Sequence, residues 1–181
     1  MKRFVKWSLY CLVIWVACLN IAHAQSAADE DTLIKAAFIY KFTKFIQWPG
    51  DIKNNSLVLC TLGEDKLVSV FDIIADNIGP NKELFIQAIH DNVSIDNCQI
   101  LYIAASERGS FRSLGAITLN QAILTISELP GFMQAGGMIE LVHEDNKIRF
   151  DINLDVAHLN DLDISSGLLK LARKVKWDNK P

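Results

Sequence analysis

The segment from Leu33 to Pro49, LIKAAFIYKFTKFIQWP, constrains the fold most, because a helix built from it carries apolar residues on two sides. On a helical projection one side holds Ile34, Phe38, Phe42 and Phe45, with Ile39 and Ile46 at its edge. The other side holds Leu33, Ala37, Tyr40 and Trp48. Such a helix packs against its own domain and against either another part of the chain or a second copy of it. It is predicted to end at Trp48, because the residue before a proline disfavours the α conformation.

The first 24 residues have the pattern of a secretory signal peptide. A basic start with Lys2, Arg3 and Lys6 precedes an apolar stretch over residues 7–21, and Ala-His-Ala at 22–24 forms a cleavage site. The alternatives are an uncleaved membrane anchor and a lipoprotein modified at Cys18, whose preceding residues match the lipidation pattern poorly. We therefore expect a secreted protein, with residues 25–181 forming a single domain that does not insert into the membrane.

Removal of this leader changes the charge of the chain. The mature part keeps 15 of the 18 basic residues and all 21 acidic ones, which gives a formal net charge of −6. An acidic domain without a basic patch argues against nucleic acid and against an anionic membrane surface as the partner. Half of the 181 residues are hydrophobic, which is enough to build one well-packed core.

Two cysteines, Cys60 and Cys98, remain after the leader is removed. An even pair in an oxidising compartment favours a disulfide. If the strands near them were parallel neighbours, however, the two Cα atoms would lie about 10 Å or more apart, beyond the roughly 7 Å limit for a bond. A bond therefore requires a stagger, a different register or strands that are not adjacent.

Strand and helix patterns alternate along the rest of the chain. Strands are predicted at 57–60, 84–89, 100–104 and 122–126, and helices at 67–74 and 106–117. Segments 138–143 and 147–153 alternate with period two and predict a β-hairpin. In its second strand Ile148, Phe150 and Ile152 face the core, whereas the opposite side remains available and holds Lys147, Arg149, Asp151 and Asn153.

A helix over residues 165–175 is predicted to close the chain, with Leu168, Leu171, Ala172 and Val175 facing inward. The order of elements predicts an α/β layered sandwich. Its sheet is mixed, largely parallel and flanked by helices, and the fold ends in a β-hairpin and a C-terminal helix.

The sequence contains no set of residues with the spacing of a catalytic or metal site. It has no CxxC motif, and no metal motif includes His90, His143 or His158. An acidic loop lacks the EF-hand spacing and is interpreted as solvated; it contains Asp155, Asp161 and Asp163. We therefore predict a binding protein that is not an enzyme and that uses neither a cofactor nor a metal.

Six segments, in their order and separations, resemble the YfiR-like family of periplasmic proteins: LIKAAFIYKFTKFIQWP, LVLCTLGED, NCQILYIA, ILTISELPGFMQAGGMIEL, KIRFDINLDVA and ISSGLLKLARKV. The resemblance covers nearly all of the mature chain, and together with the leader it implies export to the periplasm of a Gram-negative bacterium. It implies a homodimeric, non-enzymatic regulator that binds the periplasmic domain of an inner-membrane diguanylate cyclase or a similar membrane sensor. Such a regulator keeps the cyclase inactive, lowers cyclic di-GMP and restrains biofilm formation.

The resemblance also implies roles for individual residues. Cys60 and Cys98 match one cysteine pair of the family and would form its disulfide, whereas the second pair falls at Met133 and Glu140, where no such bond can form. The resemblance also implies control by the periplasmic redox state through these cysteines. The missing second pair argues against such a redox switch in this chain, and it leaves the fold assignment unchanged. Partner contacts of the family fall in the segments 137–140 and 150–157, so Ile139 and Asp151 are the candidate partner-binding residues. Alternatively, Ile139 is a core residue and Asp151 a solvated strand residue.

A periplasmic small-ligand-binding protein is the second function that the sequence allows. An α/β sheet of this kind places a ligand cleft at the carboxyl edge of its strands. A metabolite that raises the melting temperature in a dose-dependent way would favour this function, whereas co-purification of a membrane sensor would favour the regulator.

Overall fold

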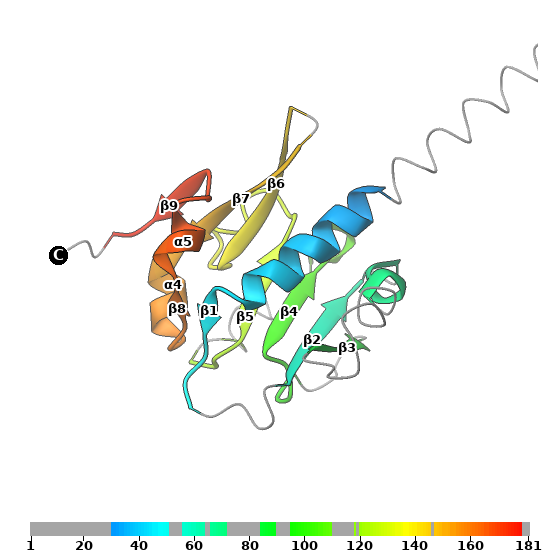
Figure 1. Cartoon of the computed structure of the whole chain (residues 1–181), viewed down its shortest axis with the longest axis horizontal. Coiled ribbons are helices and arrows are strands. Elements are labelled where there is room, and N and C mark those ends of the chain that lie inside the picture. The colour runs from blue at the N-terminus through cyan, green and yellow to red at the C-terminus, as the bar shows by residue number, and fades with distance from the viewer. Residues whose placement is uncertain are drawn as a thin grey trace, which may run out of the picture.

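A computed structural model describes residues 30–50, 56–63, 66–71, 84–89, 95–109, 118, 120–145 and 147–178 (Figure 1). The predicted signal peptide, residues 1–24, lies outside this part of the chain. Helices run over residues 30–43 and 66–71. The labelled elements are β1 (Ile46–Gln47), β2 (Leu57–Leu62), β3 (Leu84–Ile89), β4 (Ile100–Ile103), η2 (Ala105–Glu107), β5 (Leu124–Ser127), β6 (Ile139–Glu144), β7 (Lys147–Asn153), α4 (Leu154–Leu159), β8 (Asp163–Ile164), α5 (Ser166–Leu169) and β9 (Lys174–Lys176).

The described strands form one large sheet in the order β3-β2-β4-β5-β6-β7-β9, and β1 pairs separately with β8. The strands from β3 to β6 are parallel, β7 runs antiparallel to β6, and β9 is parallel to β7. Counted from β2, the parallel strands follow the doubly wound order 2-1-3-4-5. The mixed, largely parallel sheet of a layered α/β fold is thus confirmed.

Side chains that alternate along the parallel strands build a hydrophobic core on each face of the sheet. Leu59, Ile100 and Leu124 belong to the core under the helix over residues 30–43, which we call the aromatic helix. This helix lies across one face of the sheet (Figure 1). Cys60 and Leu101, their immediate neighbours along the strands, belong to the second core.

The aromatic helix buries one side and leaves part of the other exposed. Phe42 is fully buried, and its ring centroid lies 5.0 Å from that of Phe150 on β7; such burial contributes roughly 1.5–3 kcal/mol for a side chain of this size. Ile34, which the helical projection groups on one side with Phe38 and Phe42, is 40% exposed. Leu33 is 46% exposed, so apolar side chains remain uncovered near the start of this helix.

The predicted end of the aromatic helix at Trp48 is also wrong, because the helix ends at residue 43. The Phe45 N–H bonds to the Phe42 carbonyl at 2.9 Å, a tight turn that closes the helix, and the Phe45 carbonyl accepts from the Ser165 N–H at 2.9 Å. Ile46 and Gln47 then pair with β8. The pairing of residues 46–47 with β8 therefore ends the helix several residues before Pro49.

The predicted C-terminal helix over residues 165–175 is much shorter in the structure. Ser165 caps α5 by accepting from the Leu168 N–H at 3.4 Å, but α5 ends at Leu169. Of the residues predicted to face inward only Leu168 is buried. The Arg173 N–H bonds to the Phe150 carbonyl at 2.8 Å and draws the last residues into the sheet as β9.

Two further predicted helices are described only in part. Residues 66–71 are helical, and residues 72–74 of the same prediction lie outside the described chain. The predicted helix over 106–117 begins as the short 3-10 helix η2, and residues 110–117 are not described. Within the described segments, no helix combines the length and the apolar character needed to cross a bilayer.

Candidate functional site

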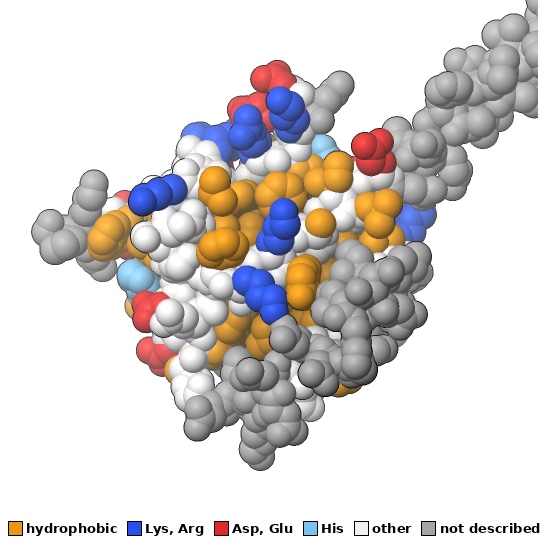
Figure 2. All heavy atoms as spheres, viewed as in Figure 1, with side chains coloured by type: hydrophobic (Ala, Val, Ile, Leu, Met, Phe, Trp, Pro, Cys, Tyr) orange, Lys and Arg blue, Asp and Glu red, His pale blue; other side chains and the backbone are white. Residues whose placement is uncertain are grey.

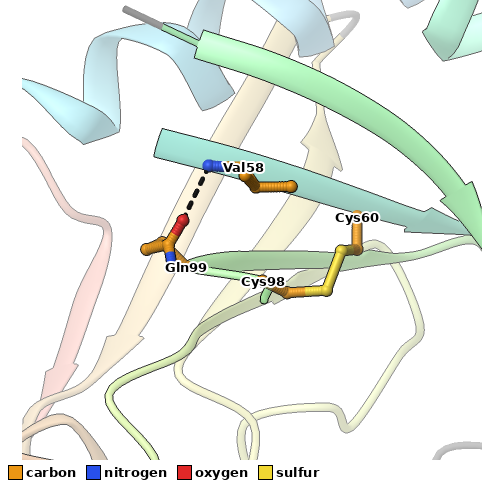
Figure 3. Close-up of a disulfide and its surroundings, with 4 residues drawn as sticks. All are labelled: Val58, Cys60, Cys98 and Gln99. Atoms are coloured by element: carbon orange, nitrogen blue, oxygen red, sulfur yellow. Dashed lines mark hydrogen bonds between the residues drawn. A yellow bond between two sulfur atoms is a disulfide. The ribbon is translucent and has the colours of Figure 1, made fainter. Parts of the chain in front are cut away.

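Cys60 and Cys98 form a disulfide with their Cα atoms 5.8 Å apart (Figure 3). Their strands, β2 and β4, are parallel neighbours in ordinary register, so the predicted need for a stagger or for separated strands is wrong. The chain bends instead: the Cys98 N–H bonds to the Ile95 carbonyl at 2.9 Å in a turn just before β4. This turn carries Cys98 back over β2.

Gln99 fixes this bend against β2. Its N–H donates to the Val58 carbonyl at 3.0 Å, and its side-chain Oε1 accepts from the Val58 N–H at 2.8 Å (Figure 3). Both cysteines are buried in the core on the face opposite the aromatic helix. A disulfide across 38 residues stabilises by roughly 4 kcal/mol in the chain-entropy model. Its burial gives it the environment of a structural bond.

Met133 and Glu140, where the second cysteine pair of the resembled family falls, are linked by a hydrogen bond. The Glu140 carboxylate accepts from the Met133 N–H at 3.0 Å and from the Gly131 N–H at 3.2 Å. Both residues are buried, and the Asn153 side chain donates to the Met133 carbonyl at 3.1 Å. A carboxylate therefore ties the loop over residues 130–137 to β6 without a covalent bond.

Both candidate partner-binding residues are buried. Ile139 is 0% exposed and pairs with Ile126 and Ile152 on the neighbouring strands, which agrees with its alternative reading as a core residue. Asp151 is 3% exposed. The prediction that its side of β7 remains available is therefore wrong at this residue, and so is its alternative interpretation as a solvated residue.

Arg173 covers Asp151 with a bidentate ion pair. Its Nε and Nη2 donate to the two carboxylate oxygens at 2.9 and 2.7 Å, and Nη1 donates to Glu144 at 3.3 Å. The hydrogen bonds to Asp151 raise the pKa of the Arg173 guanidinium. The sequence gives no local signal for this pair, because the partners lie 22 positions apart and meet only through the sheet.

A second charged cluster lies where the aromatic helix meets the ends of β5 and β6. Lys35 Nζ contacts a carboxylate oxygen of Asp31 and one of Glu128, each at 2.8 Å. Burial lowers the pKa of Lys35, but the hydrogen bonds to the two carboxylates outweigh it and the net pKa is raised. His143 Nε2 lies 3.7 Å from Asp31 and 3.9 Å from Glu128. This cluster anchors the start of the aromatic helix.

An open groove of about 510 Å³ lies at the other end of the aromatic helix. It is lined by Gln47, Trp48, Pro49, His158, Asp161, Leu162 and Asp163. Trp48 Nε1 donates to the Gln99 carbonyl at 3.3 Å, which places the groove near the start of β4. The ligand cleft was predicted at the carboxyl edge, whereas this groove lies at the amino edge. Among the described residues, no three His, Cys, Asp or Glu side chains are grouped to hold a metal ion.

Comparison with known proteins places the chain in a family. A family model described as YfiR/HmsC-like matches residues 32–173, which include the aromatic helix from its first turn, both cysteines of the disulfide and Arg173. No curated protein matches the chain. Because the family model spans well over half of the sequence, the chain belongs to the YfiR/HmsC-like family.

Proposed function

We propose that this protein is a periplasmic regulator that binds the periplasmic domain of an inner-membrane diguanylate cyclase, or of a similar membrane sensor, and keeps it inactive. The family match over residues 32–173 carries the proposal, because the family is one of periplasmic regulators of diguanylate cyclase signalling. The disulfide between Cys60 and Cys98 supports it, since such bonds persist in oxidising compartments. Bound to its partner, the regulator lowers cyclic di-GMP and restrains biofilm formation.

Repression of this kind requires no chemistry in the regulator. It requires tighter binding to the inactive state of the partner than to the active state. A difference in binding free energy of about 1–3 kcal/mol gives roughly 5- to 150-fold coupling. A rigid domain with a fixed surface meets this requirement. The disulfide fixes the core on one face of the sheet, and the Asp151–Arg173 pair fixes the end of the sheet at β9.

Ile139 and Asp151 act in this proposal by shaping the surface rather than by touching the partner. Ile139 packs between β5 and β7 and sets the position of β6. Asp151 holds Arg173, and through it β9, against the edge of β7. The partner then meets Arg173 and β9 instead of the two buried side chains.

Capture of the membrane partner tests this role. Asp151→Asn removes the charge that holds Arg173, and we expect retention of the partner on the immobilised mature protein to weaken about 5- to 30-fold, as for a loss of roughly 1–2 kcal/mol. Asp163→Asn, a similar change at a side chain that is 79% exposed near the groove, serves as the control. Equal retention by both variants would show that Asp151 does not position the surface that binds the partner.

A pull-down from detergent-solubilised inner membranes tests the function itself. The tagged protein is expected to retain a protein that has a periplasmic sensory domain and a cyclase domain. The proposal fails if no such protein co-purifies and deletion of the gene leaves cyclic di-GMP unchanged.

A second copy of the chain is proposed to cover the exposed side of the aromatic helix. In Figure 2 hydrophobic side chains gather over this helix with Lys side chains among them. The exposed positions Leu33, Ile34 and Ala37 lie between Glu30 at one end and Lys44 at the other. Two such helices crossing antiparallel at Ala37 bring the Glu30 of each close to the Lys44 of the other, which makes the surface self-complementary.

The mass of the mature protein in solution tests this dimer. Ala37→Glu places two like charges at the centre of the pairing, and we expect light scattering to show a dimer for the parent chain and a monomer for this variant. Lys66→Glu, an exposed substitution on another helix, should leave the dimer intact. A parent chain that is monomeric at high concentration, or a dimeric Ala37→Glu variant, contradicts the pairing.

Small-ligand binding is retained as a second candidate function because of the groove beside Trp48. Its volume of about 510 Å³ suits a small metabolite, and Trp48 and Pro49 offer apolar surface next to Asp161 and Asp163. A thermal-shift screen of the mature protein checks it: a ligand that raises the melting temperature of the parent chain and not of Trp48→Ala supports this function.

A further inference from the structure

The last strand of the sheet, β9, forms an edge that no other described strand pairs with. It follows β7 in parallel register, with Lys174 opposite Asp151 and Lys176 opposite Asn153. The side chains of Lys174, Val175 and Lys176 are all exposed. An uncovered edge of this kind presents backbone groups that can pair with another chain.

The direction of these backbone groups follows from the pairing of β7. The Asn153 N–H bonds to the Met138 carbonyl on the β6 side, whereas the Phe150 carbonyl accepts from Arg173 on the β9 side, so Phe150 and Ile152 direct their backbone groups toward β9. In the register that sets Lys174 opposite Asp151 and Lys176 opposite Asn153, the N–H and C=O groups of both lysines therefore face β7. Successive residues of a strand alternate in this direction, so Val175 directs its N–H and C=O groups outward.

This edge is held in place from both ends. Arg173 binds Asp151 with two hydrogen bonds at its start, and the Asp178 N–H bonds to the Asp155 carboxylate at 3.0 and 3.1 Å beyond its end. An incoming strand therefore meets a preformed template and does not have to order it.

The charge along the edge is basic, although the mature chain carries a net charge of −6. Exposed cations on β9 and beside it are Lys147, Arg149, Lys170, Lys174 and Lys176; Lys and Arg side chains gather over this end of the sheet in Figure 2. Two of the nearby acids are paired, Glu144 with Arg173 and Asp178 with Lys176 at 3.5 Å. The sequence predicts no basic patch, and at this edge that prediction is wrong.

We propose that β9 accepts an extended acidic segment of the regulated membrane protein as an additional strand of the sheet. This proposal rests on the proposed function and names the contact through which it works. The outward backbone groups of Val175 supply the pairing, and the side chains of Lys174 and Lys176 on either side of it select glutamates or aspartates on the incoming strand. A second copy of β9 is disfavoured, because it would place lysines opposite lysines.

Binding of a synthetic peptide tests this edge directly. The probe is acetyl-Glu-Val-Glu-Val-Glu-amide, titrated into the isotope-labelled mature protein and followed by amide resonances and calorimetry. We expect saturable binding with the largest amide shift at Val175, and no binding of the matched peptide acetyl-Lys-Val-Lys-Val-Lys-amide.

Val175→Pro is the decisive variant, because it removes the outward N–H and leaves in place the backbone groups of Lys174 and Lys176 that face β7. We expect it to lower peptide affinity at least tenfold with an unchanged melting temperature. If it unfolds the edge, the double variant Lys174→Glu/Lys176→Glu, which keeps every backbone group, should show the same loss. Lys66→Glu, exposed on the helix over residues 66–71, should bind as the parent chain does.

Three results overturn the proposal: no binding of the acidic peptide, binding that survives both the proline and the double glutamate change, or equal binding of the lysine peptide. Adsorption to phosphatidylglycerol vesicles that exceeds peptide binding and survives Val175→Pro would assign the edge to a lipid surface instead. The proposed function fails by a different result, an unchanged cyclic di-GMP level after deletion, so the two failures are distinguishable.

Discussion

At the scale of single residues, the Glu140 carboxylate joins two segments at the positions where the family resemblance implies a second disulfide. The sequence showed only that Met133 and Glu140 cannot form a disulfide. The structure adds that Glu140 accepts from the Met133 and Gly131 N–H groups and so joins the same two segments. A hydrogen-bonded link of this kind does not respond to oxidants, which separates this chain from a switch that uses two disulfides.

Glu140→Gln tests the strength of this link. The substitution keeps one acceptor and puts an NH₂ group against an N–H that is buried, so we expect the free energy of unfolding to fall by about 1–3 kcal/mol. Urea unfolding of the mature protein measures the change. Glu144→Gln on the same strand, at an exposed side chain, should cost less than about 0.5 kcal/mol; equal losses would contradict the assigned role.

At the scale of elements, the sequence predicted the sheet better than the ends of the helices. Strands with alternating or buried apolar patterns were placed within two residues, as with β3 at Leu84–Ile89. The final helix was predicted wrongly because Arg173 pairs with Asp151, 22 positions away, and residues 174–176 join the sheet as β9. Local patterns contain no information on such long-range pairing, and helix preference yields to it.

Lys35 shows how one element is anchored to another. Its pKa is raised in the folded state by Asp31 and Glu128, so its contribution to stability is fully present below the unfolded value of 10.5 and is lost as the pH rises through the folded value. We expect Lys35→Met to lower the free energy of unfolding by roughly 1–3 kcal/mol at neutral pH.

Denaturant unfolding from pH 7 to pH 11.5 measures this effect. The difference between the parent chain and Lys35→Met should stay constant to about pH 10 and shrink above it. Lys41→Met, on the exposed side of the same helix, should show almost no difference at any pH. A Lys35→Met difference that grows with alkaline pH would contradict the ion-pair account.

At the scale of the whole molecule, the disulfide joins β2 to the turn that precedes β4, within the core on the face opposite the aromatic helix. The pairing of Cys60 with Cys98 was predictable from their number and from the compartment, but its geometry was not. The turn at residues 95–98 and the side chain of Gln99 decide that geometry, and neither has a signature in the sequence. Burial of both sulfurs makes the bond part of the core.

Removal of the bond should therefore affect stability more than signalling. We expect Cys60→Ala/Cys98→Ala to lower the free energy of unfolding by roughly 4 kcal/mol. Mild reductant should leave the native domain oxidised, with thiols becoming reactive to a dye only after denaturant is added. Rapid reduction of the native protein, together with altered capture of its membrane partner, would instead identify the bond as a redox switch.

The level of cyclic di-GMP in cells tests the central claim most directly. It should be measured in the parent strain, in a strain lacking this gene, and in the same strain supplied with the gene again. The account predicts a rise on deletion that is reversed when the exported protein is restored. An equal level of cyclic di-GMP in all three strains would contradict it.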